Sequence, residues 1–91
     1  MDSGDAIPNP QYQALLPPAR PAAMPDPALP LKERIHEATD ALRLAKMHRL
    51  GYDRLAAHAR IVLALRMAAE QAMGGRVRTT ITARSIASLI R

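Results

Sequence analysis

The position of its prolines constrains this chain more than any other feature. All eight prolines lie at or before Pro30, and none follows. Each proline removes a backbone donor and pushes the preceding residue toward extended conformations. Residues 1–30 are therefore predicted to form a disordered, partly polyproline-like tail. Apolar anchors that could dock on a partner lie in the stretch PQYQALLPPARP: Tyr12, Leu15 and Leu16. A plain flexible tail is the simpler interpretation.

Residues 31–91 remain for one folded domain, and they are poor in large side chains. The chain has no Trp or Phe, and Tyr52 is the only aromatic residue of this part. Domains of this size are marginal alone and usually need disulfides, a metal or a partner chain. Cysteine is absent, which excludes disulfides and thiolate metal sites. We therefore expect oligomerisation to stabilise the fold.

Positive charge is concentrated in the same residues. The whole chain has a net charge of +5, whereas residues 31–91 hold twelve Lys or Arg against five Asp or Glu, a net +7. A basic domain points to an anionic partner such as nucleic acid. The longest strongly apolar run, Ile61 to Leu65, is far shorter than the ~20 residues of a bilayer span. We expect a soluble, intracellular protein.

The first helix is predicted to open at Leu31, directly after the last proline. Its apolar stripe follows helical spacing: Leu31, Ile35, Ala38, Leu42 and Ala45. Arg49 takes the next position on this stripe, so the helix is predicted to end near Ala45. Residues 46–52 would then form a connection, and a single helix continuing to Leu50 is the alternative.

The second helix is predicted from about Asp53, as N-cap, to Met73, where Gly74 and Gly75 stop it. It is apolar almost all round, as helices with neighbours on several sides are. Because the chain offers few other residues, we expect some of these neighbours to belong to a second molecule.

A basic, β-branched stretch over residues 74–82 favours an extended backbone. A third, short helix follows from about Ala83 to Arg91, with Thr82 as its predicted N-cap. Its apolar side consists of Ile86, Leu89 and Ile90. The chain is thus predicted to be all-α.

The segment RTTITARSI, from Arg78 to Ile86, resembles the second loop and third-helix start of histones and their prokaryotic relatives. In that family a basic residue precedes Ser, Thr or Lys, then Thr, then an apolar residue, and an Arg- or Glu-containing turn leads into the third helix. The residues that match this pattern are Arg78, Thr79, Thr80, Ile81, Arg84 and Ile86. The resemblance covers residues 29–91 and implies a histone fold of short, long and short helices.

The resemblance also implies a handshake dimer, with the same chain or another histone-fold chain, in which the second loop of one subunit lies beside the first loop of the other. The merged surface would contact the backbone of double-stranded DNA without sequence preference. Implied DNA-contacting residues are Arg76, Arg78, Thr79, Thr80, Lys46 and Arg49. Expected dimer-interface residues are Leu55, Val62, Leu65, Ala69, Met73 and Ile86. The implied location is a nucleoid, a nucleus or virion chromatin.

Ser85 stands where many histones carry an acidic residue that pairs with the loop arginine. Other interpretations therefore stay open. The arginines could form a solvated basic surface on a protein-interaction module that binds no DNA, either a heterodimer subunit or a regulator. A helix-turn-helix reader with Ala83–Arg91 as recognition helix ranks lowest.

The sequence contains no residue pattern typical of a catalytic site or a metal site. Ser85 and Ser88 lack a base and carboxylate arranged for nucleophilic catalysis, and no glycine-rich phosphate loop precedes a helix. The histidines are too widely spaced for a ligand set: His36, His48 and His58. We expect no enzyme activity, cofactor or small-molecule substrate.

Overall fold

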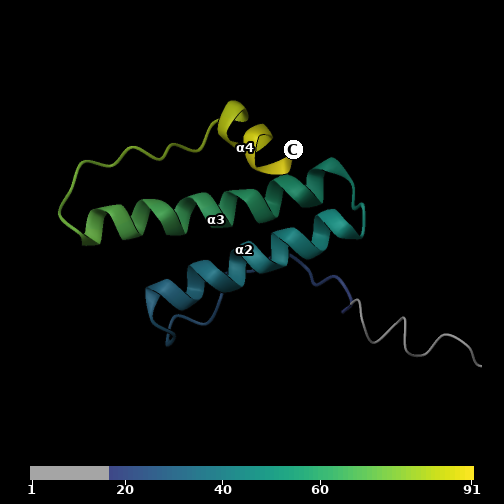
Figure 1. Cartoon of the computed structure of the whole chain (residues 1–91), viewed down its shortest axis with the longest axis horizontal. Coiled ribbons are helices and arrows are strands. Elements are labelled where there is room, and N and C mark those ends of the chain that lie inside the picture. The colour runs from purple at the N-terminus through teal and green to yellow at the C-terminus, as the bar shows by residue number, and fades with distance from the viewer. Residues whose placement is uncertain (1–16) are drawn as a thin grey trace, which may run out of the picture.

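The computed structural model describes residues 17–91, which form three helices. They are α2 (Leu31–Met47), α3 (Tyr52–Ala72) and α4 (Ala83–Ile90). Helices α2 and α3 form an antiparallel hairpin, and α4 lies on the other side of α3 (Figure 1). No strand occurs within residues 17–91. This part of the chain is all-α, as predicted.

Helix α2 extends two residues beyond the predicted end near Ala45. It stops where Arg49 takes a left-handed conformation with φ of 55°. The N–H of Arg49 donates to the Lys46 carbonyl at 3.0 Å, and the N–H of Leu50 donates to the Ala45 carbonyl at 3.2 Å. This is a Schellman ending, which usually places glycine at the left-handed position. The nearby Gly51 instead precedes α3 with an extended backbone.

The C-terminal end of α3 and the start of α4 follow their predicted local signals, whereas α3 begins at Tyr52 with Gly51 as N-cap, so that Asp53 lies in its first turn and not at the predicted N-cap position. After α3, Gly74 adopts a φ of 73°, a conformation that residues with a Cβ rarely take. At the start of α4, the N–H of Ser85 donates to the Thr82 hydroxyl at 3.1 Å, and the N–H of Thr82 donates to the Ser85 hydroxyl at 2.8 Å. Ser85 thus closes a capping box, which stabilises the first turn of α4.

The hydrophobic core lies where all three helices meet. It consists of Ala38, Leu42, Ala56, Ala59, Val62, Leu63, Leu65 and Ile86. Val62 is fully buried at its centre. The buried residues of α3 all fall between Ala56 and Leu65. The chain therefore covers this part of α3 by itself, and the expected need for a second molecule applies only to the part after Leu65.

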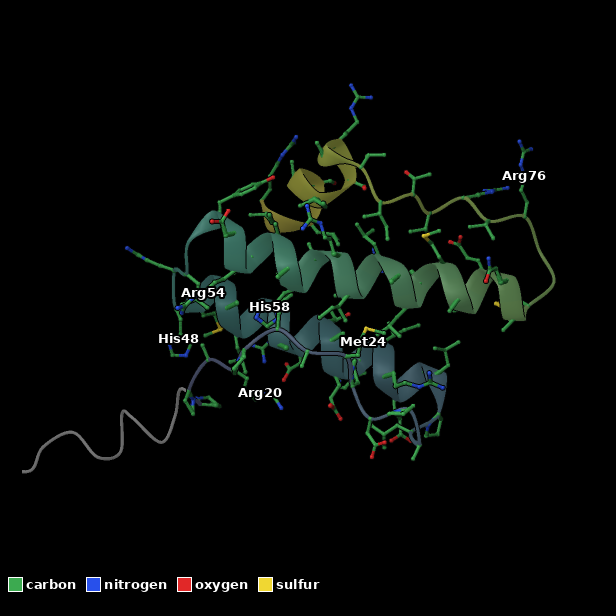
Figure 2. The ribbon with its side chains drawn as sticks, turned by 180° about the vertical axis from the view of Figure 1, so that it is seen from behind. Arg20, Met24, His48, Arg54, His58 and Arg76 are labelled. Atoms are coloured by element: carbon green, nitrogen blue, oxygen red, sulfur yellow. The ribbon has the colours of Figure 1, made fainter. Side chains whose placement is uncertain are left out.

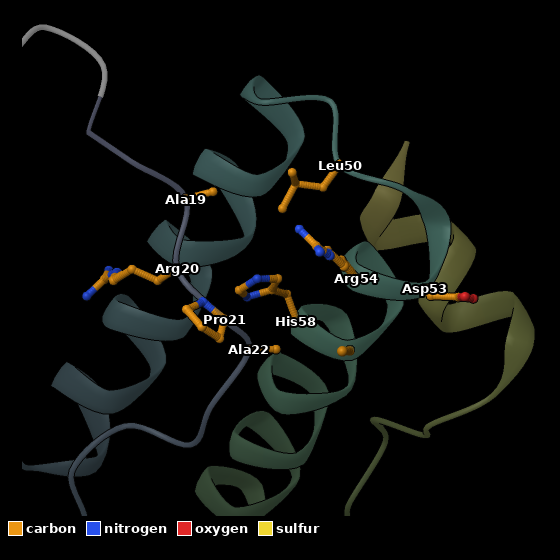
Figure 3. A pocket seen from close by; sticks show the side chains of 9 residues that line it. Ala19, Arg20, Pro21, Ala22, Leu50, Asp53, Arg54 and His58 are labelled. Carbon is orange, nitrogen blue, oxygen red and sulfur yellow. The ribbon is translucent and has the colours of Figure 1, made fainter. Parts of the chain in front are cut away.

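Residues 17–30, here called the N-terminal strap, follow a defined irregular path against the helices, although their proline content predicts a disordered tail. The strap passes over α2 and α3 near His58, which is only 3% exposed (Figures 2 and 3). The Nε2 atom of His48 lies 2.7 Å from the Pro17 carbonyl oxygen, within hydrogen-bond distance. The predicted anchors in the rest of the tail, namely Tyr12, Leu15 and Leu16, lie outside the described residues.

Candidate nucleic-acid interface

Residues 73–82, here called the arginine loop, connect α3 to α4. The loop leaves the end of α3 at Gly74 and runs back along that helix to α4 (Figure 1). Arg76 projects from the end of the molecule at which α3 stops (Figure 2). The β-branched residues keep this stretch out of helix, as predicted, and without a neighbouring strand it forms an irregular extended segment.

Glu70, on the last turns of α3, holds the arginine loop in place. Its Oε1 accepts hydrogen bonds from the N–H of Arg78 at 2.9 Å and the N–H of Thr79 at 3.0 Å. Its Oε2 accepts one from the Thr79 hydroxyl at 2.6 Å. The Thr79 hydroxyl and then the Thr79 N–H lower the pKa of the Glu70 carboxyl below its ordinary value. Sequence reasoning missed Glu70, although it is the only acidic residue after Asp53.

The loop residues that were expected to touch DNA divide into two groups. Arg76, Arg78 and Thr80 are exposed, so their side chains are accessible to a ligand. Thr79 is half-buried, and its hydroxyl is taken up by Glu70. Thr79 therefore positions the loop, because its hydroxyl donates to Glu70 and not to a DNA phosphate.

A shallow hollow of about 260 Å³ lies between the arginine loop, α3 and α4. We call it the arginine hollow. It is lined by Leu63, Arg66, Arg78, Thr79, Thr80, Ser85, Ser88 and Leu89. Within residues 17–91 an ion pair joins the Arg43 guanidinium to the Asp40 carboxylate at 2.6 Å. In the same residues, no carboxylate oxygen lies within 4.0 Å of the guanidinium nitrogens of Arg66 or Arg78. Two arginines thus line one hollow.

The two cationic residues expected from the first loop lie at the opposite end of the molecule. The α2–α3 connection, which carries Arg49 and His48, lies far from Arg76 (Figures 1 and 2). Lys46 has an internal role, because its Nζ donates to the Leu89 carbonyl at 2.8 Å at the end of α4. A positive charge there stabilises the helix terminus. One chain therefore does not bring these residues and the arginine loop together.

The residues expected at a dimer interface also divide into two groups. Val62, Leu65 and Ile86 are buried in the chain's own core, so they form no outer surface in this conformation. Leu55 is half-buried against the same core. By contrast, Met73 is 85% exposed. It lies in an apolar patch at the open end of the hairpin, together with Leu31, Ile35, Ala69 and Ala72.

The three histidines within residues 17–91 lie apart from one another, each in different surroundings. His58 is buried under the strap, His48 lies beside Pro17, and His36 is exposed. Within residues 17–91 no three His, Asp or Glu side chains gather in a way that suits a metal ion. In the same part of the chain, no helix has both the length and the apolar content that a bilayer span requires.

The chain matches no protein-family model, no curated protein and no solved structure.

Proposed function

We propose that the chain binds the backbone of double-stranded DNA without sequence preference, as a histone-like dimer with an architectural or compacting role. The observation that carries this proposal is the attachment of the arginine loop to Glu70. Two main-chain N–H groups and one hydroxyl fix the loop, while Arg76 and Arg78 stay exposed. A loop that is already ordered loses less conformational entropy when it binds.

The chemistry of the exposed groups favours phosphate over base contacts. Guanidinium groups bind phosphate oxygens through two parallel hydrogen bonds. A base-reading element needs several polar side chains on a helix or strand that enters a groove. Helix α4 has only eight residues and offers few such side chains. Binding that depends on phosphate contacts is sequence-independent and weakens steeply with salt.

A dimer would bring the arginine loop close to Arg49, which lies at the opposite end of the same chain. In a handshake arrangement, the arginine loop of one subunit lies beside the α2–α3 connection of the other. Arg49 in that connection is exposed and holds a left-handed conformation that glycine adopts at lower cost. A strained residue of this kind is a candidate for function. We therefore keep Arg49 in the proposed surface and assign Lys46 to the support of α4.

A salt series on random-sequence duplex DNA tests the proposal. The test variant combines Arg76→Ala with Arg78→Ala. The control combines Arg20→Ala with Arg60→Ala, which removes the same charge from exposed positions outside the loop. Each lost phosphate contact lowers the slope of log K against log [salt] by about 0.9, so the test variant should lose about 1.8 per chain. The control should keep the slope of the unaltered chain.

Two results would reject the proposal. One is the absence of DNA binding at low salt, and the other is an equal loss of binding in the test and control variants. Light scattering under the same conditions checks the dimer, which we expect at micromolar concentration.

A protein-interaction module without DNA binding is the second candidate. The apolar patch around Met73 favours it, because exposed apolar surface of this kind often marks a protein contact. A Met73→Glu variant tests whether the apolar patch mediates assembly, which it should abolish for either function, because the DNA-binding dimer would use Met73 too. DNA binding by the unaltered chain separates the two functions, since an interaction module should bind no DNA at low salt.

A further inference from the structure

We infer that the arginine hollow seats a single phosphate group, and that Arg66 of α3 completes this seat. This inference rests on the proposed function, because it takes the phosphate group to be a phosphodiester of DNA. Three elements meet at the hollow: Arg66 comes from α3, Arg78 from the arginine loop and Ser88 from α4. Sequence reasoning placed Arg66 on no binding surface.

Arg66 would ordinarily be expected to pair with Glu70. The two residues are four positions apart on α3, a spacing at which opposite charges on a helix attract each other. Here both carboxylate oxygens of Glu70 accept hydrogen bonds from Arg78 and Thr79, and Arg66 is not within 4.0 Å of that carboxylate. The loop has thus taken the partner that Arg66 would otherwise have. Arg66 lines the hollow and is exposed, so its side chain is accessible to an anion.

The hydroxyl groups around the hollow have distinct roles. The Ser85 hydroxyl donates to the Thr80 carbonyl at 2.7 Å and accepts from the N–H of Thr82, so it holds the loop against α4. The Ser88 hydroxyl is exposed and makes no hydrogen bond within residues 17–91. Ser88 can therefore donate to a phosphate oxygen between the two arginines.

The shape and charge of the hollow suit a phosphodiester. Its volume of about 260 Å³ exceeds what one phosphate group fills, and the hollow is open to solvent. Arg66 and Arg78 contribute two positive charges against the single charge of Glu70, which is directed at the loop backbone. The hollow thus keeps an excess of positive charge. A group with one negative charge and two unesterified oxygens matches two guanidinium forks.

The experiment compares Arg66→Ala with Arg60→Ala in the full chain. Both residues are exposed arginines on α3, but only Arg66 lines the hollow. In the salt series on random duplex DNA, Arg66→Ala should reduce the slope by about 0.9 relative to the unaltered chain. Arg60→Ala should leave it unchanged. Circular dichroism confirms that both variants keep their helices, and Arg66→Lys should retain the slope but weaken binding, because lysine lacks the fork.

A second measurement separates this inference from the proposed function. Inorganic phosphate is titrated into the unaltered chain and into Arg66→Ala, and the amide signals of Thr80, Ser85 and Ser88 are followed by NMR. If DNA binds and the two single variants behave alike, the seat is refuted while DNA binding stands. If DNA does not bind but phosphate shifts these amides only when Arg66 is present, the seat stands and its ligand is a small phosphate compound. If neither ligand binds, both ideas are rejected.

Discussion

Replacing Ile86 by alanine tests whether α4 is held by its own chain. Ile86 is the buried residue of α4, with 4% of its surface exposed, and it packs into the core formed by α2 and α3. No other side chain of α4 is buried to this degree. Loss of this contact should therefore loosen α4 and the end of the arginine loop that leads into it.

The size of the effect follows from the carbon atoms that are removed. Each buried methylene contributes about 0.8 kcal/mol, and the change removes three carbon atoms, or about 2.4 kcal/mol. The cavity that remains adds to this loss, and measured substitutions of this kind cost about 2–5 kcal/mol. We expect about 3 kcal/mol for Ile86→Ala. Since small domains have a net stability near the lower end of about 5–15 kcal/mol, this is a large part of the total.

Urea unfolding followed by circular dichroism measures the loss. With a denaturant slope of about 1 kcal/mol per molar, the midpoint should fall by about 3 M. Ile81→Ala is the matched control, because Ile81 lies in the arginine loop and is 42% exposed. It should cost about 0.5 kcal/mol or less. Equal losses in the two variants, or a loss below about 1 kcal/mol for Ile86→Ala, would refute the packing of α4 described here.

Two further predictions follow from the backbone and from Glu70. The free energy of unfolding of Arg49→Gly should exceed that of Arg49→Ala by about 1 kcal/mol. Both variants lose the guanidinium, but only glycine relieves the strain of the left-handed conformation. Equal urea midpoints for the two variants would contradict this. Hydrogen bonding lowers the pKa of Glu70, so its contribution is fully present above its ordinary pKa of 4.5 and is lost as the pH falls through the lowered value. Exchange protection of the Arg78 and Thr79 amides should therefore persist at pH 5 and disappear in stronger acid, and Glu70→Gln should remove most of this dependence. Protection that stays constant through this range would show that Glu70 does not hold the loop.

The sequence alone predicted the features that depend on local hydrogen bonds and sterics. The three helices, the stop at Gly74 and the N-cap at Thr82 were all predicted within about two residues of their observed positions. The end predicted near Ala45 lies two residues before the observed end at Met47, because a charge on the apolar stripe does not itself stop a helix. Helix α2 ends just before Arg49, whose left-handed conformation has no signal in its residue type.

Contacts between distant residues depended on the tertiary structure. The Lys46 Nζ donates a hydrogen bond to the carbonyl of Leu89, 43 positions later in the chain. Lys46 was expected to contact DNA, but in the structure it supports the end of α4. Val62 and Ile86 are covered by their own chain, although the sequence suggested that a partner would cover them. Glu70 reaches the loop only because residues 73–82 turn back along α3, and this turn leaves Arg66 without its usual helical partner. Helix starts and stops are determined within one or two turns of the chain, whereas the partner of a charged group is determined by which segments the folded path brings within hydrogen-bond distance.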